Sequence, residues 1–276
     1  MEQILKAMLE NVRAKTPLVH NITNYVTVND VANVLLAAGG SPIMSDDADD
    51  VEDITSICGG LNINIGTLNK RTIESMFLAG KKANELGHIV LLDPVGAGAS
   101  RLRTDTANRL MREVRFDAVR GNISEIKTLC TGSGTTKGVD ADAVDAVTEA
   151  NLDDGVALVK AFARQAGCII AVTGAIDLVS DGERCWCIRN GRAEMSRITG
   201  TGCQLSALTT AFLVANPEHK LEAAAAAVCM MGLAGEIGWA NMQPGDGNST
   251  YRNRIIDAIF NMTGDALEEG AKYELR

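Results

Sequence analysis

Histidine and positive charge are scarce in this chain of 276 residues. Three histidines are too few to suggest a histidine-built metal centre. The formal net charge of −9 leaves no evident basic face that could neutralise phosphates, which argues against broad binding to nucleic acid or to an anionic membrane surface. No uninterrupted apolar run approaches the roughly 20 residues needed to span a bilayer. We therefore expect neither nucleic acid nor a membrane as a partner.

Cysteine is present, but not in the spacing of a disulfide framework. The seven cysteines are odd in number, and the one close pair, Cys185 and Cys187, is explained better by alternation across a strand than by a metal. Residues 1–6 have neither the basic start nor the apolar core of a signal peptide. We expect a cytoplasmic protein with reduced thiols.

Apolar strands and helices alternate along most of the chain. Strands are predicted at 41–44, 61–65, 89–92, 118–119 and 168–172. Helices are predicted at 4–13, 29–38, 70–86, 104–112, 153–166, from 204 onward, 221–239 and 254–263. This alternation implies a mainly parallel sheet covered by helices on both faces.

The remaining segments have other patterns. A hairpin is predicted over 178–188, with Asp181-Gly182 as its two-residue turn. The acidic run 46–53 is interpreted as a solvated helix start, and 131–138 as a polar, Gly-rich insert. The charged residues after 263 are expected to fray. Because no linker or internal repeat is visible, we expect a single domain over residues 1–276.

The stretch 198–207 holds two glycines, Gly200 and Gly202, followed by a helical pattern. A glycine turn that opens a helix gathers free backbone N–H groups and the positive end of the helix dipole, which together can bind phosphate. Cys203 lies where the turn meets the helix, and small residues on its face leave room for a ligand. A tight connection that binds nothing explains an isolated Gly-Thr-Gly equally well, so this pattern alone leaves both interpretations open.

Polar residues follow four predicted strands at the point where each strand ends. They are Gly66-Thr67, Asp93-Pro94, Arg120-Gly121-Asn122 and Thr173-Gly174. In open α/β sheets, ligands bind in the crevice beyond the carboxyl ends of the strands. Carboxylates, an arginine, hydroxyls and backbone amides at such an edge suit phosphoryl transfer, which depends on positioning and charge neutralisation.

Asp93 and Glu125 are the natural pair to hold Mg²⁺, directly or through water, because magnesium takes one or two carboxylates besides substrate phosphates. Each also has a structural explanation. Asp93 can start a turn before its proline, and Asn122 and Glu125 have the spacing of a capping box. Arg120 emerges from a buried strand and needs an anionic partner, for which a nucleotide phosphate and Glu125 are the candidates.

Several of these stretches together resemble the hydroxyethylthiazole kinase family, in order and over nearly the whole chain. They are 17–24, 92–96, 120–125, 172–174 and 200–203. The resemblance implies the ribokinase-like fold, an α/β three-layer sandwich with a mainly parallel central sheet. It further implies a homotrimer with active sites at the subunit interfaces. The implied reaction moves the γ-phosphate of ATP to the hydroxyl of 4-methyl-5-(2-hydroxyethyl)thiazole, with Mg²⁺, in thiamine salvage.

The resemblance also implies residue roles on the nucleotide side. Arg120 and Thr173 match positions that contact ATP, while Asp93 and Glu125 match the magnesium-associated acidic positions.

On the substrate side, Met44 and Gly200 match positions that contact the thiazole. Asn24 and Gly66 are expected near it.

Cys203 matches the place where sugar kinases of the superfamily carry an aspartate base. A thiol, with a reference pKa of about 8.5, is a weaker base at neutral pH unless the helix start lowers that pKa, so we expect modest turnover. The backbone amides of Gly200, Thr201 and Gly202 form an anion hole for the transferred phosphoryl group.

Two other kinds of function fit part of this pattern. A dehydratase that repairs hydrated NAD(P)H, or a kinase of another small alcohol such as hydroxymethylpyrimidine, shares the implied fold, but an aspartate is expected there in place of Cys203. A non-catalytic sensor of nucleotide or thiazole does not need Asp93, Glu125 and Arg120 together. The thiazole kinase is the favoured hypothesis.

Overall fold

One continuous mixed sheet runs through the computed structural model, which describes residues 3–131 and 146–276. Its order is β2-β1-β3-β4-β5-β6-β7-β8-β9. The strands are β1 (Leu18–Ile22), β2 (Ser41–Met44), β3 (Gly60–Asn64), β4 (Ile89–Asp93), β5 (Ala118–Asn122), β6 (Ile169–Thr173), β7 (Asp177–Ser180), β8 (Cys185–Ile188) and β9 (Tyr273–Leu275). Strands β1 to β6 are parallel, and β7, β8 and β9 extend the sheet in antiparallel pairs. The predicted mainly parallel sheet is confirmed.

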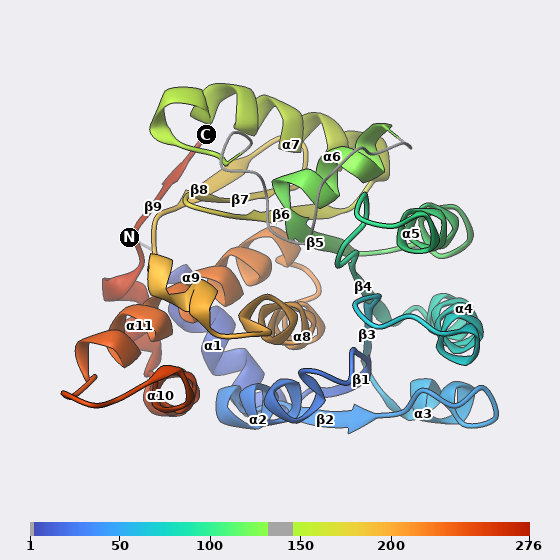
Figure 1. The fold of residues 1–276 in the computed structure, drawn as a ribbon, viewed down its shortest axis with the longest axis horizontal. Coiled ribbons are helices and arrows are strands. Elements are labelled where there is room, and N and C mark those ends of the chain that lie inside the picture. The colour runs from blue at the N-terminus through green and yellow to red at the C-terminus, as the bar shows by residue number, and fades with distance from the viewer. Residues whose placement is uncertain (1–2, 132–145) are drawn as a thin grey trace.

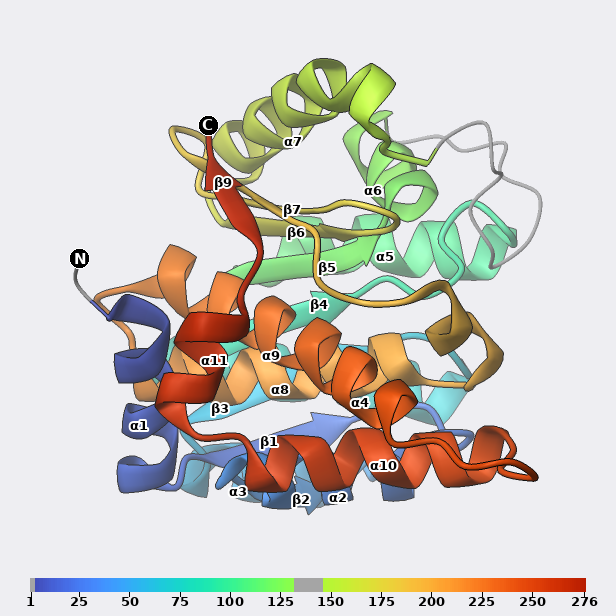
Figure 2. The same cartoon turned by 90° about the vertical axis from the view of Figure 1, so that its left-hand side faces the viewer.

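Helices cover both faces of this sheet, giving three layers (Figure 1). On one face lie α3 (Val51–Ile57), α4 (Lys70–Leu86), α5 (Arg101–Glu113), α6 (Ile123–Thr131) and α7 (Leu152–Ala166). On the other lie α1 (Ile4–Lys15), α2 (Val28–Ala38), α8 (Thr201–Ala215), α9 (Lys220–Ala240), α10 (Asn248–Asn261) and α11 (Gly264–Gly270). Figure 2 views the second set from outside, with α10 and α11 in front of the sheet. Two short 3-10 helices, η1 (Glu149–Asn151) and η2 (Ala193–Arg197), complete the described elements.

Alternation along the strands decides which side chains reach each layer. In β4, Val90 and Leu92 belong to the core under α4 and α5, whereas Leu91 belongs to the core under α8 and α9. Since successive strand residues point to opposite faces, Asp93 lies on the same face as Leu91. The carboxyl end of β4 therefore presents Asp93 to α8, where its side chain meets Ser206.

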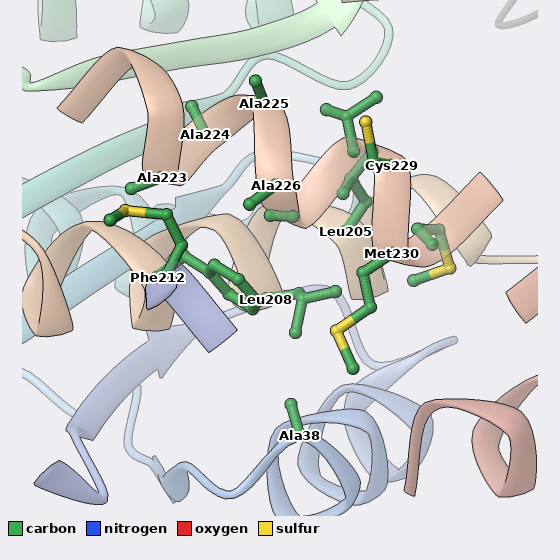
Figure 3. Packing of buried hydrophobic residues seen from close by; sticks show 14 of the residues in the cluster. Ala38, Leu205, Leu208, Phe212, Ala223, Ala224, Ala225, Ala226, Cys229 and Met230 are labelled. Atoms are coloured by element: carbon green, nitrogen blue, oxygen red, sulfur yellow. The ribbon is translucent and has the colours of Figure 1, made fainter. Parts of the chain in front are cut away.

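Helices α8 and α9 form the centre of the second layer. The apolar side chains Leu205, Leu208 and Phe212 of α8 lie beside the alanine-rich start of α9 (Figure 3). Helix α9 is long and apolar enough to cross a membrane by length and composition, but 78% of its apolar window is buried in the protein. It is a core helix. The sequence shows no uninterrupted apolar run of this length, because Glu222 and Glu236 lie within the helix.

Four details of the sequence prediction differ from the structure. Residues after 263 do not fray: α11 packs on α1, where Glu268 accepts hydrogen bonds from Leu5 N and Lys6 N, and β9 pairs with β8. The hairpin connection has four residues rather than two, because Ser180 pairs with Cys185. Strand β1 and helix α6 were not predicted.

The other segment predictions have different outcomes. The acidic run leads into α3, which begins at residue 51. The alternation of Cys185 and Cys187 within β8 is confirmed, and all seven cysteines are free. The predicted insert lies, apart from residue 131, outside the described residues.

Candidate active site

The carboxyl ends of β4, β5 and β6 meet the start of α8 beside a cavity of about 920 Å³. Four residues predicted to contact ATP or to form the anion hole line it: Arg120, Thr173, Thr201 and Gly202. They arrive from β5, the end of β6 and the first turn of α8. The predicted ATP contacts and two of the three predicted anion-hole residues, Thr201 and Gly202, are therefore parts of one concave surface.

Arg120 is the cation of this surface. Its side chain is only 11% exposed, its Nη2 donates a hydrogen bond to Thr173 Oγ1 (2.5 Å), and its Nη1 lies 3.8 Å from Asp93 Oδ1. Within the described residues its Nε is buried without a hydrogen-bond partner. The anionic partner at ion-pair distance is thus Asp93, not the Glu125 considered from the sequence. The remaining N–H capacity of Arg120 suits a further anion.

Asp93 is fully buried, and only one of its two carboxylate oxygens is satisfied by hydrogen bonds. Oδ2 accepts from Asn64 Nδ2 (2.8 Å) and from Ser206 Oγ (2.7 Å). No described residue donates a hydrogen bond to Oδ1. Burial raises the pKa of Asp93, while Arg120, Ser206 and Asn64 oppose that shift. Oδ1 is an unused acceptor facing a cation, which is costly unless another positive group joins it.

Glu125 makes the capping box that its spacing suggested. Glu125 N donates to Asn122 Oδ1 (2.9 Å), and Asn122 N donates to Glu125 Oε2 (2.8 Å). The other oxygen, Oε1, accepts from Gly96 N (2.8 Å), so Glu125 also fixes the loop after β4. Burial and the nearby Asp93 raise the pKa of Glu125 to about 7. Structural and metal-binding roles are compatible, because each carboxylate oxygen keeps a second lone pair.

The donor set fits Mg²⁺ rather than a metal held by protein ligands alone. Across residues 3–131 and 146–276, no group of three or more His, Cys, Asp or Glu side chains could hold an ion. Magnesium needs only one or two carboxylates when phosphates and water complete its octahedron. Asp93 Oδ1 is available for this, and the charge of Asp93 adds to burial in raising the pKa of the nearby Glu125, as a like charge does.

Cys203 is buried at the start of α8, where Asn24 Nδ2 donates a hydrogen bond to its Sγ (3.1 Å). The same amide donates to Asn64 Oδ1, which links the thiol to the Asp93 network. Burial, and then the charge of Asp93, raise the pKa of Cys203. The net shift is upward despite the position of Cys203 at a helix start, so the thiol is mostly protonated at neutral pH.

Met44, at the end of β2, packs against the small cluster that contains Cys203. Gly200 precedes α8 with φ +85°, and a Cβ there would lie 2.2 Å from Thr27 Cγ2, so the position requires glycine. Gly66 N donates to Asn64 Oδ1 (2.9 Å), close to Asn24. The predicted thiazole contacts are therefore gathered around the β1 side of α8.

The first turn of α8 separates the two predicted substrate sites. Its Gly202 faces Arg120 of β5, and its Cys203 faces Asn24 after β1. Among the described residues that line the large cavity, Met44, Gly200 and Cys203 do not occur. Because β1 and β5 lie on opposite sides of β3 and β4, the nucleotide side and the thiazole side meet only at the α8 turn.

Sequence reasoning missed one wall of the cavity. It comprises Asn190, Gly191, Arg192, Ala193, Met195 and Ser196, with Asp177 and residues of α9. This segment lies on two glycines of α9. A Cβ at Gly232 would lie 2.7 Å from Asn190 Cβ, and one at Gly235 would lie 2.2 Å from Met195 Sδ. In the sequence, this contact is indicated only by the two glycines, Gly232 and Gly235. They allow another segment to pack closely on α9, but they do not show which segment it is.

Known proteins are similar to this chain over nearly its whole length. The Hydroxyethylthiazole kinase family matches residues 9–265. Hydroxyethylthiazole kinase of Clostridium acetobutylicum is 58% identical over 98% of this chain and 99% of its own.

Solved structures show the same relation. The hydroxyethylthiazole kinase protein from Pyrococcus horikoshii OT3 is 33% identical, with a TM-score of 0.88 and 99% of both chains covered. A ribokinase-like superfamily protein from Enterococcus faecalis V583 is 12% identical, with a TM-score of 0.61 and 94% of each chain covered, and shows a shared fold alone. The chain therefore belongs to the hydroxyethylthiazole kinase family, and it is an ATP-using kinase that phosphorylates hydroxyethylthiazole in thiamine salvage.

Proposed function

We propose that the reaction transfers the γ-phosphate of ATP to the hydroxyl of 4-methyl-5-(2-hydroxyethyl)thiazole at the start of α8, with Mg²⁺. One observation carries this proposal: Arg120, Thr173 and Gly202 meet at the cavity where a helix N-terminus is open to a ligand. Backbone N–H groups and the dipole of α8 favour an anion there.

On the nucleotide side, Arg120 and Thr173 bind phosphate oxygens, and the backbone amides of Thr201 and Gly202 stabilise charge on the phosphoryl group as it transfers. Glycine is needed at 202 because a Cβ would lie 2.5 Å from Arg120 Nη1. The preformed contact between Arg120 and Thr173 holds the guanidinium before the nucleotide arrives, which lowers the ordering cost of binding.

Asp93 and Glu125 would hold Mg²⁺, directly or through water. When bound, the ion would neutralise charge on the phosphates. Hydrogen bonds from Asn64 and Ser206 position the carboxylate of Asp93. Hydrogen bonds from the backbone amides of Gly96 and Asn122 position that of Glu125. These bonds keep both carboxylates in place whether or not the nucleotide is bound.

On the acceptor side, the thiolate form of Cys203 takes the proton of the attacking hydroxyl and becomes the thiol, and Asn24 holds the sulfur in position. Since burial raises the pKa of Cys203, little thiolate is present at neutral pH, which supports modest turnover. Met44, Gly200, Asn24 and Gly66 surround the thiazole.

We also propose a homotrimer whose subunit contacts complete the thiazole site. The loop that directly follows Asn24 exposes two large apolar side chains, Tyr25 (78% exposed) and Val26 (56% exposed). Apolar residues beside a half-open substrate site favour coverage by another subunit. Light scattering coupled to gel filtration tests this assembly; a monomer at working concentrations would contradict it.

The chain is further proposed to act as one domain in the cytoplasm. The single sheet that includes both β1 and β9 supports the first statement, and seven unpaired cysteines support the second.

A coupled ADP-release assay with ATP, hydroxyethylthiazole and Mg²⁺ tests the proposed reaction. Hydroxymethylpyrimidine, omission of the acceptor and chelation of the metal serve as controls. Thiazole-dependent ADP release, with the phosphorylated thiazole identified by mass and lost on chelation, supports the proposal. Folded protein that binds ATP without such turnover would contradict it.

A further inference from the structure

Asp177 is an acidic residue in the wall of the cavity that the proposed reaction does not use. It begins β7, is half-buried, and its Oδ1 accepts a hydrogen bond from Gly174 N (2.8 Å). This bond shapes the turn between β6 and β7 but engages one carboxylate oxygen. A carboxylate repels a bound polyphosphate because their charges have the same sign. Its place in this cavity therefore suggests a contact with another part of the ligand.

The sheet places Asp177 between the two ends of the cavity. Strands β5, β6, β7 and β8 are consecutive neighbours, and they bring Arg120, Thr173, Asp177 and then Asn190 to the same rim. Asp177 pairs with Ile188, two residues before Asn190. Neighbouring strands are about 4.8 Å apart, so Asp177 lies about 10 Å from the strand of Arg120.

The cavity wall formed by α9 and η2 is partly apolar. Ala193, Met195, Val228 and Met231 line the cavity there and offer surface suited to the face of a purine ring. A nucleotide whose phosphates lie at Arg120 and Thr173 would therefore extend its base toward these residues. The sugar, which joins the two parts, falls at the intermediate strand β7.

We propose that the carboxylate of Asp177 accepts hydrogen bonds from the ribose hydroxyls of ATP and so makes the enzyme selective for ribonucleotides. The inference rests on the proposed nucleotide site. Hydroxyls are donors that an ionised carboxylate, which has only acceptors, can pair with, and bonds to charged acceptors are stronger than neutral ones. Burial raises the pKa of Asp177 to about 7, while the hydrogen bond from Gly174 N and the charge of Arg120 oppose that shift and favour the carboxylate.

Asp177→Asn separates this role from shaping the turn, because the amide oxygen can still accept from Gly174 N. The matched control is Asp181→Asn, at the opposite end of β7, where the carboxylate accepts from Glu183 N and Arg184 N outside the cavity. We expect the KM for ATP to rise roughly tenfold in Asp177→Asn with kcat within about twofold, and neither value to change in Asp181→Asn.

Two probes make the test independent of how the variant folds. With the wild-type enzyme, 2′-deoxy-ATP or 3′-deoxy-ATP should show a KM raised roughly tenfold over ATP. In Asp177→Asn the same analogue should raise KM little above the value that this variant shows with ATP, since the substitution has already removed the contact. Unchanged KM values for both analogues with the wild type would overturn the inference, as would fully additive losses in the variant. Absence of thiazole-dependent turnover in the wild type would instead refute the proposed function.

Discussion

Gly202→Ala should separate catalysis from folding in this enzyme. A Cβ at this position would lie 2.5 Å from Arg120 Nη1 and 2.8 Å from Nη2, and no glycine-only backbone angle is involved. Ordinary contacts begin near about 3.5 Å, so the guanidinium must move by about 1 Å. We expect that shift to break the 2.5 Å hydrogen bond from Arg120 Nη2 to Thr173 Oγ1.

The stability cost of this change is small. Arg120 can swing because its guanidinium is the far end of a flexible side chain, and the lost charged hydrogen bond costs about 1.5–3 kcal/mol. Alanine has a higher helix propensity than glycine, so the substitution in the first turn of α8 stabilises the helix by about 0.5–1 kcal/mol. A net loss of about 1–2 kcal/mol lowers Tm by no more than about 8 °C.

The catalytic cost is larger, because a misplacement of about 1 Å in a positioned group can cost about 10²-fold. We expect kcat/KM for ATP to fall about 10²-fold in the coupled ADP-release assay, with the assembly unchanged by light scattering. Gly247→Ala is the matched control, because its Cβ meets open space. Activity within about threefold of wild type would refute the assignment of Gly202 and Arg120 to the phosphate site, and loss of the assembly would indicate a structural role.

Three further predictions concern the base, the metal and the cavity wall. Because burial raises the pKa of Cys203, kcat should rise with pH beyond neutrality, and Cys203→Ala should lower kcat by up to about 10² while flattening that rise. Because burial and then the charge of Asp93 raise the pKa of Glu125 to about 7, protons compete with the metal below that pH, so the Mg²⁺ concentration for half-maximal rate should increase as the pH is lowered from about 8 to about 6. Gly235→Ala should push Met195 into the cavity and raise the KM for ATP severalfold with little change in kcat, both measured in steady-state kinetics.

Each of these predictions has an outcome that contradicts it. Near wild-type kcat in Cys203→Ala would remove the thiol as the base. A pH-independent Mg²⁺ requirement would place the metal away from Glu125. An unchanged KM in Gly235→Ala, with Gly247→Ala as control, would mean that the segment around Met195 does not limit the nucleotide site.

Local patterns predicted most of the fold. Helix α4 was predicted at its observed bounds, because its apolar residues repeat at helical spacing. Strand β4 was predicted to within one residue, and the residues that follow it were placed at the ligand-binding rim. The prediction failed where polar residues are buried. In β1, His20 is fully buried because Nδ1 meets Thr55 Oγ1 and Nε2 meets the Ser45 carbonyl, partners that a local pattern does not show.

By itself, the sequence determined the local structural motifs of this protein: the glycine turn before α8, the capping box of Asn122 and Glu125, and the polar residues at the strand ends. Each depends on neighbours within a few positions along the chain. The tertiary structure decided which residues from other parts of the chain contact these motifs. It gave Arg120 the partner Asp93, laid the segment around Met195 over a glycine of α9, and buried Cys203 so that its pKa rises instead of falling. These outcomes depend on distances between segments far apart in the chain, which only the packing of the sheet and its helices fixes.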